Sequence, residues 1–154
     1  MPRKVRRDMP DTTLHERAVA AMARLINDDP YRTLLDAFPV IIFATDIHGV
    51  VTLSEGRGLE SLGLQAGQLV GISIFESFGN LTNSVRALRS AIAGEPANSI
   101  DIAFGRTLET RFTPIRDEQG TVTGIAAMSW DITERVASEL RLLRVNRLYA
   151  VLSQ

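Results

Sequence analysis

The sequence contains TLETRFTPIRDEQGTVTGIAAMSWDI at residues 107–132, and this stretch predicts a hairpin of two long strands. Apolar and polar residues alternate on both sides of the turn DEQG (117–120), which is the period of a strand with one covered face. The covered face is expected to carry Leu108, Thr110, Phe112, Val122, Gly124, Ala126, Met128 and Trp130.

Three further strands are predicted upstream of this hairpin. Residues 99–104 alternate apolar residues with aspartate, which adds another antiparallel strand with Ile100, Ile102 and Phe104 on its covered face. Residues 40–46 are β-branched and apolar, as in a buried strand, and residues 50–54 return after a tight turn at His48-Gly49. The expected sheet therefore has five strands.

Two helices are predicted before the first strand. A Thr-x-x-Glu capping box opens an apolar stripe with helical spacing over residues 13–27. Asp29 is the expected N-cap of a shorter helix, which ends before Pro39. Residues 55–79 hold six glycines among short apolar pieces, which indicates short helices joined by tight bends.

Two more helices are predicted further along the chain. Asn80 is the expected cap of a helix over residues 81–93, and Gly94 is its expected C′ residue. Thr133 is the expected cap of an apolar helix over residues 133–154. Because this helix runs to the last residue without a terminating glycine, we expect the sequence to be part of a longer protein.

The composition excludes several kinds of chemistry. The chain has 154 residues, no cysteine, two histidines and a net charge of −1. Disulfides, thiolate metal sites and cysteine nucleophiles are therefore ruled out, and a two-histidine metal site is not expected. The near-zero charge argues against a nucleic-acid partner. Without a run of 18 apolar residues or a secretory signal, we expect a cytoplasmic protein with no membrane span.

No motif for catalysis is present. The sequence lacks a G-x-S-x-G nucleophile, an H-E-x-x-H zinc motif and a phosphate-binding loop. We therefore do not expect an enzyme.

Four segments, in order and at the right spacing, resemble the PAS domain family. They are FATDIHGVVTLSEGRGLESLGL (43–64), GQLVGISIFE (67–76), SVRALRSAIAGE (84–95) and RFTPIRDEQGTVTGIAAMSWDITER (111–135). The last closes on the Asp-Ile-Thr triplet that commonly joins a PAS core to its output helix. The resemblance covers about two thirds of the chain.

The resemblance implies an α+β fold: a five-stranded antiparallel sheet in the order 2-1-5-4-3 with helices on one face. It implies a tail and flanking helix over residues 1–29, a core over residues 30–132 and an output helix over residues 133–154. It also implies a sensory module of two-component or cyclic di-GMP signalling, whose kinase or diguanylate cyclase output domain is absent from this chain.

An apolar interior between sheet and helices is the predicted ligand site. Its small residues, such as Gly124 and Ala126, either leave room for a mostly apolar ligand or match large residues opposite in a filled core. The candidate ligand-binding residues are Phe43, Leu53, Phe75, Val85, Leu88, Ile92, Ile102, Phe104, Phe112, Met128 and Trp130.

The cofactors known in PAS domains are tested by residue type. Residues 79–95 contain no histidine, which argues against the usual haem ligand, and the absence of cysteine excludes a cysteinyl-flavin adduct. Flavin held without a covalent bond, with Trp130 as neighbour, stays open as an alternative. His48 is expected to be an exposed turn residue.

Signal coupling is assigned to Asp131, Thr133 and Arg135, where an ion pair between the carboxylate and the guanidinium would set the direction of the helix. The alternative is a plain N-terminal acid beside a solvated arginine. Two uncovered helical stripes predict a homodimer, and they include Leu14, Ala18, Leu25, Leu142, Val145 and Tyr149. For the function of the whole chain, the first alternative to a ligand-binding sensor is a ligand-free dimerisation scaffold. The second is a haem- or flavin-binding sensor.

Overall fold

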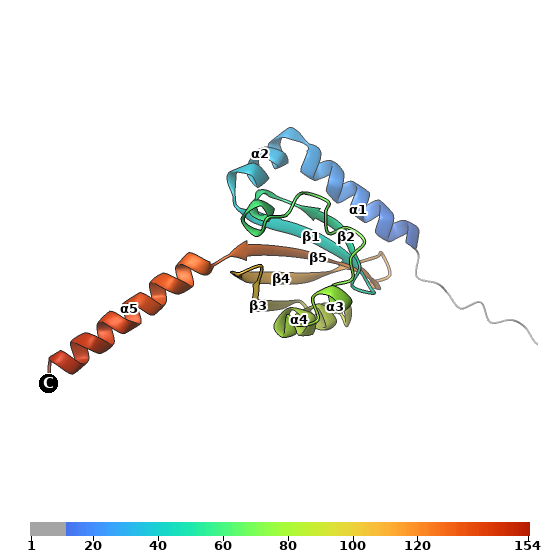
Figure 1. Cartoon of the computed structure of the whole chain (residues 1–154). Helices are drawn as coiled ribbons and strands as arrows, with labels where there is room; N and C mark the ends of the chain where they lie inside the picture. The colour runs from blue at the N-terminus through green and yellow to red at the C-terminus, as the bar shows by residue number, and fades with distance from the viewer. Residues whose placement is uncertain (1–11) are drawn as a thin grey trace, which may run out of the picture.

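The computed structural model describes residues 12–154, so the predicted basic tail of residues 1–10 and the side chains of Leu14 and Ala18 lie outside the described part. A five-stranded antiparallel sheet in the order β2-β1-β5-β4-β3 forms the centre (Figure 1). The elements are α1 (Thr12–Asn27), α2 (Asp29–Ala37), β1 (Val40–Asp46), β2 (Val51–Glu55), η1 (Arg57–Leu62), α3 (Ile74–Ser77), α4 (Thr82–Ile92), β3 (Ala97–Ala103), β4 (Arg106–Arg116), β5 (Val122–Asp131) and α5 (Thr133–Leu152). The predicted order is confirmed, and every strand lies within two residues of its expected ends.

On the three central strands β1, β5 and β4, a small residue packs between two large ones. Ala127 of β5 lies opposite Phe43 of β1 on one side and opposite Phe112 of β4 on the other. The two phenylalanine rings meet edge to face with their centroids 5.9 Å apart. An aromatic pair in this geometry contributes about 0.5–1.5 kcal/mol beyond the area it buries, and a larger side chain at position 127 would push the rings apart.

The core lies between the sheet and α4. Ala87, Leu88 and Ala91 form the buried face of α4 and pack on the inner face of β4 and β5. Phe112 and Ile125 fill the sheet side of this cluster. The small alanines of the helix let its backbone approach the strands closely, as a filled core requires.

The opposite, outer face of the sheet is covered at one end by α1. Ala44 and Leu53, neighbours in the β1–β2 register, point away from the α4 side and are nevertheless buried. Helix α1 lies against β2 and β5. The N-terminal flanking helix is therefore packed on the sheet (Figure 1).

The predicted face is wrong for two strands. On β3, Ser99, Asp101 and Ala103 face the helices, whereas Ile100 and Ile102 are exposed on the outer face. The reason is that the amide and the hydroxyl of Ser84, in the first turn of α4, need hydrogen-bond partners. Asp101 and Ser99 provide these partners.

On β5 the inner residues are Ile125, Ala127 and Ser129, whereas Ala126, Met128 and Trp130 lie on the outer face. Val122, at the start of the strand, packs against the core as predicted. This strand is apolar at almost every position, so alternation alone does not tell its two faces apart. The inner-facing prediction for Leu108, Thr110 and Phe112 of β4 is confirmed.

Three helix caps also differ from expectation. The N-caps are Asp28 rather than Asp29, Leu81 rather than Asn80 and Ile132 rather than Thr133, and none of these three donates or accepts a capping side-chain hydrogen bond. The orphan amides near the starts of α4 and α5 are instead bound by carboxylates from the sheet, as described below. Gly94 is confirmed at C′ of α4, after the C-cap Ala93.

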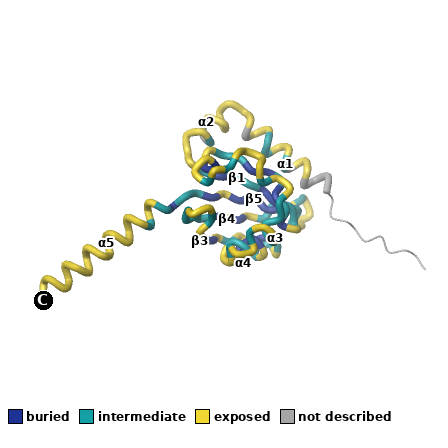
Figure 2. Tube along the Cα trace, viewed as in Figure 1, coloured by how far each residue is buried: buried dark blue, intermediate teal, exposed yellow. Residues whose placement is uncertain are grey.

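Helix α5 leaves the domain at the end of β5 and projects away from it (Figure 1). Beyond its first turn almost every residue is exposed, as the continuous exposed colouring in Figure 2 shows. The exposed large apolar residues of α5 are Leu140, Leu142, Leu143, Val145, Leu148, Tyr149, Val151 and Leu152. A helix with this surface is not stabilised by the domain that it leaves.

Candidate functional site

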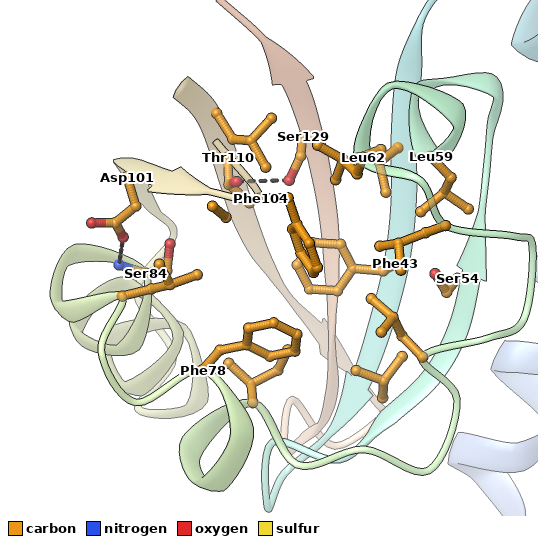
Figure 3. A pocket seen from close by; sticks show the side chains of 18 of the residues that line it. Phe43, Ser54, Leu59, Leu62, Phe78, Ser84, Asp101, Phe104, Thr110 and Ser129 are labelled. Carbon is orange, nitrogen blue, oxygen red and sulfur yellow. Dashed lines mark hydrogen bonds between the residues drawn. The ribbon is translucent and has the colours of Figure 1, made fainter. Parts of the chain in front are cut away.

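A pocket lies between the inner face of the sheet and the helical layer (Figure 3). Its volume is about 100 Å³. Most of its wall is apolar and comes from β1, η1, the segment before α3, and the β3–β4 region. The side chains in Figure 3 include Phe43, Leu59, Leu62, Phe78 and Phe104.

Phe78 and Phe104 come from different layers and meet at the pocket. Phe78 follows α3, Phe104 belongs to the two-residue turn between β3 and β4, and their ring centroids are 6.0 Å apart. Phe104 is 49% exposed although it lines the pocket, so this aromatic pair stands between the cavity and solvent.

The backbone of Phe104 is held in an unfavourable conformation. Its φ is +53°, and it is the one non-glycine residue with positive φ in the part of the chain that the structure describes. Gly105 follows with φ +72°, so both central residues of the turn are positive, as in a type I′ hairpin. Such turns favour Asn-Gly, and an aromatic residue there carries strain of about 1–3 kcal/mol.

Three hydroxyl groups line the sheet side of the pocket. Thr110 and Ser129, opposite each other on β4 and β5, share a hydrogen bond of 2.6 Å between their oxygens. The Ser54 hydroxyl of β2 is buried and, within the described residues, has no hydrogen-bond partner. Leaving a buried hydroxyl unsatisfied costs about 1–3 kcal/mol.

Asp101 is the ionisable residue of the pocket wall. Its Oδ2 accepts from the backbone N–H of Ser84, in the first turn of α4, over 2.6 Å. The Ser84 and Ser99 hydroxyls lie 3.0 Å apart beside this contact. Asp101 thus supplies the capping acceptor that Leu81 lacks, and it ties β3 to the helix N-terminus.

The β3–β4 turn is also fastened to the start of α5. The Arg106 Nε donates to Asp131 Oδ2 over 2.6 Å. The Thr107 N–H donates to the Thr133 hydroxyl over 2.9 Å, and the Ile132 N–H donates to the Thr107 carbonyl over 2.8 Å. Two consecutive residues of β4 therefore hold the three residues that connect the sheet to α5.

Asp131 supplies the capping carboxylate that Ile132, the N-cap of α5, lacks. Its Oδ1 accepts from both the amide and the hydroxyl of Thr133. Burial alone raises the pKa of Asp131, but the hydrogen bonds from Thr133 and the Arg106 guanidinium outweigh it and hold the pKa below its usual value of 3.8. Asp131 is therefore ionised at neutral pH.

A second charged contact lies on the outer face. Glu109 Oε2 accepts from the Trp130 indole N–H over 3.0 Å and lies 3.3 Å from the Arg135 guanidinium. The predicted Asp131–Arg135 ion pair is thus wrong: Asp131 pairs with Arg106, and Arg135 pairs with Glu109. The two residues of each ion pair lie too far apart in the sequence for their spacing to predict the contact.

The structure separates the eleven predicted ligand residues into three groups. Phe43, Phe104 and Phe112 line the pocket. Phe75, Val85, Leu88 and Ile92 belong to the helical layer, and none of them lines the pocket. Leu53, Ile102, Met128 and Trp130 lie on the outer face, with Ile102 70% exposed, so the structure places them away from the predicted cavity.

Sequence reasoning missed several residues of the site. Ser54 and Ser129 look like ordinary strand serines, and Phe78 follows a short helix. Nothing in the sequence around Arg106 and Glu109 indicates their distant ion-pair partners. One signal was available: a phenylalanine directly before Gly105, between two strand patterns, is unusual for a two-residue turn.

Other sequence expectations concern the rest of the chain. His48 is exposed in the β1–β2 turn, as predicted, and Asp46 Oδ1 accepts there from the amides of His48 and Val50. No group of three or more histidine, aspartate or glutamate side chains suited to a metal ion occurs within residues 12–154. None of the described helices combines the length and apolar character needed to cross a bilayer.

Comparison with solved structures gives the same fold. The PAS domain of a Colwellia psychrerythraea protein is 17% identical, with a TM-score of 0.54, over 69% of this chain and 97% of that one. A sensory box sensor histidine kinase from Vibrio cholerae is 18% identical, with a TM-score of 0.50, over 77% of this chain and 98% of that one. An RNA-binding light-oxygen-voltage receptor is 19% identical, with a TM-score of 0.62, over all of this chain and 42% of the receptor.

At these identities the solved structures show the fold alone. A search of curated protein sequences found no match. The family model described as the PAS fold matches residues 35–137, which is more than half of the chain and spans the whole sheet. The chain therefore belongs to the PAS family.

Proposed function

We propose that this chain is a sensory module that binds a small, mostly apolar molecule in the pocket and passes its state through α5 to an output domain. The β3–β4 turn is the observation that carries the proposal. Phe104 of this turn lines the pocket, and Arg106, two residues later, bonds to Asp131 at the start of α5. This short segment thus contacts both the pocket and the start of α5.

The relay follows from this geometry. A ligand that moves the Phe104 ring moves a tight two-residue turn, which has little freedom to absorb the change. Arg106 and Thr107 then shift against Asp131, Ile132 and Thr133, so the direction of α5 changes. The ligand acts by favouring one of two arrangements of this connection.

A homodimer provides the partner that α5 lacks. Leu142, Val145, Tyr149 and Leu152 follow the 3-4-3 spacing of a coiled-coil seam and are all exposed. We propose that the α5 helices of two copies pair along this seam, with the core of residues 30–132 between the flanking helices. The output would be a histidine kinase or diguanylate cyclase domain of the parent protein.

The alternative functions require different features of the structure. A ligand-free scaffold needs the dimer but not the pocket. A haem or flavin sensor needs a much larger cavity, whereas about 100 Å³ is below the roughly 150 Å³ of an engineered cavity that holds benzene. We therefore favour a small ligand over haem or flavin. We also propose a non-catalytic role and a cytoplasmic location, which follow from the sequence expectations alone.

Spin labels on α5 test the relay. Because the chain has no cysteine, an Arg147→Cys variant carries one nitroxide, on the side of α5 opposite the proposed seam. We expect a narrow distance distribution between the two copies, which broadens when Arg106→Gln is added. Arg111→Gln, an exposed arginine of the same strand on the outer face, is the matched control.

Each outcome bears on a different part of the proposal. No distance between copies at tens of micromolar would show that α5 does not pair. A narrow distribution that Arg106→Gln leaves unchanged would overturn the relay through the β3–β4 turn while leaving the dimer intact.

A further inference from the structure

We infer that the pocket selects an uncharged ligand with an apolar body and one hydroxyl or carbonyl oxygen, which hydrogen-bonds to Ser54. This inference rests on the proposed function, because it names the class of molecule that the pocket takes. It is carried by an unpartnered buried hydroxyl, by the absence of a cation from the pocket wall and by the size of the cavity.

Ser54 supplies the hydrogen bond. Its side chain is 1% exposed, lines the pocket, and has no hydrogen-bond partner within the described residues. The other sheet-side hydroxyls, Thr110 and Ser129, already bond to each other. A hydroxyl donates and accepts, so Ser54 can bind either an alcohol or a carbonyl oxygen. Native structures satisfy nearly all their buried polar groups, and a ligand oxygen would satisfy this one.

The charge of the wall excludes anions. The residues that line the pocket include no lysine, arginine or histidine, and their one ionisable side chain is the Asp101 carboxyl. A carboxylate or phosphate in the cavity would be desolvated beside a like charge with no cation to pair with it. Asp101 already accepts from the amide of Ser84, so it serves the helix rather than a cationic ligand.

The size of the cavity limits the ligand. A volume of about 100 Å³ is smaller than the roughly 150 Å³ cavity that holds benzene, so it admits a molecule of about four to five non-hydrogen atoms. The aromatic wall of Phe43, Phe104 and Phe112 suits a short branched chain.

Four probes of one shape separate these properties. Isobutane, 2-propanol, acetate and isopropylamine, all small branched molecules of similar size, are titrated into the full chain and followed by amide chemical shifts. We expect 2-propanol to bind about three- to tenfold more tightly than isobutane, as one neutral hydrogen bond gives. We expect acetate and isopropylamine to bind at least tenfold more weakly than the alcohol, because a charge must be desolvated.

The Ser54→Ala variant identifies the hydroxyl. It should bind 2-propanol no better than isobutane, and its own thermal midpoint should rise, because the unsatisfied hydroxyl is gone. A serine with a merely structural role would lower the midpoint instead. Ser129→Ala is the matched control: it removes a hydroxyl from the same wall and should keep the preference for the alcohol. Ser54→Cys, close in size, serves if the alanine variant fails to fold.

The outcomes separate this inference from the function that it rests on. If no probe shifts the pocket amides, ligand binding itself is wrong. If isobutane and 2-propanol bind the parent and Ser54→Ala alike, or if acetate binds as tightly as the alcohol, the pocket binds ligands but the class inferred here is wrong.

Discussion

The Arg106 guanidinium lies 2.6 Å from the Asp131 carboxylate and joins the turn at the pocket to the first turn of α5. The contact is partly buried on the aspartate side, where 16% of the side chain is exposed. Its removal therefore affects both elements, which Thr107 also joins through Ile132 and Thr133. Because Asp131 bonds to both Arg106 and Thr133, it is the most informative position for measuring the connection.

Replacing Asp131 with asparagine should change the pH dependence of stability. The pKa of Asp131 is lowered in the folded chain, so its contribution is fully present above the unfolded value near 3.8 and is lost as the pH falls through the folded pKa. Asp131→Asn should cost about 1 kcal/mol at neutral pH, because the pair is partly solvated, and less below about pH 3. Urea unfolding at both pH values measures the difference.

The control for this experiment is Glu118→Gln, an exposed carboxyl in the β4–β5 turn. It should leave the free energy of unfolding nearly unchanged at both pH values. An Asp131→Asn variant whose loss is the same at acidic and neutral pH would show that the carboxylate charge does not stabilise the connection.

Replacing Gly56 with alanine should destabilise the domain strongly. Gly56 has φ +113°, and a Cβ there would lie 2.3 Å from the Val40 carbonyl oxygen, which belongs to the backbone of β1 and cannot move aside. We expect a loss of about 3 kcal/mol or more in the free energy of unfolding. Gly120→Ala is the matched control, because its φ is +83° but nothing lies within 4 Å of the added atom, so it should cost only about 1 kcal/mol. Equal losses in the two variants would contradict the close approach.

The sequence predicted the strands and their order well, because their signals are local or depend on the order of motifs along the chain. The alternation on β4 identifies its inner face, since charged residues separate the apolar ones. On β5 the same reasoning fails, because Ala126, Met128 and Trp130 are as apolar as Ile125 and Ala127. Only the register with neighbouring strands and the covering helices decides the face of such a strand.

The site was harder to predict than the fold. Asp101 looks like the solvent-facing residue of an amphipathic strand, yet it faces inward because Ser84 needs an acceptor. Arg106 and Asp131 are 25 residues apart and meet only through the β4–β5 register. The missing hydrogen bond of Ser54 is a property of its surroundings, and no sequence pattern records it.

A charge placed in the proposed seam of α5 should weaken the dimer. Leu142→Glu puts a carboxylate at a position that is 64% exposed in one copy and buried in the proposed pair. We expect at least a tenfold increase in the dimer dissociation constant, measured by sedimentation equilibrium. Arg144→Gln, at an exposed position of the same helix outside the seam, is the control, because it lowers the net charge by the same amount. Equal effects of the two variants would argue that dimerisation uses another surface.

The strain at Phe104 predicts a difference between two variants that their lost contacts alone would make equally stable. Phe104→Ala and Phe104→Asn both remove the ring and its contact with Phe78. Alanine keeps the unfavourable positive φ, whereas asparagine creates the Asn-Gly sequence that type I′ turns prefer. The asparagine variant should therefore be more stable than the alanine variant by about 1 kcal/mol in urea unfolding. Phe78→Ala removes the same aromatic contact without touching the turn, so it measures the contact alone. If the alanine and asparagine variants are equally stable, the turn is not strained, and Phe104 is held at the pocket without opposing its own backbone preference.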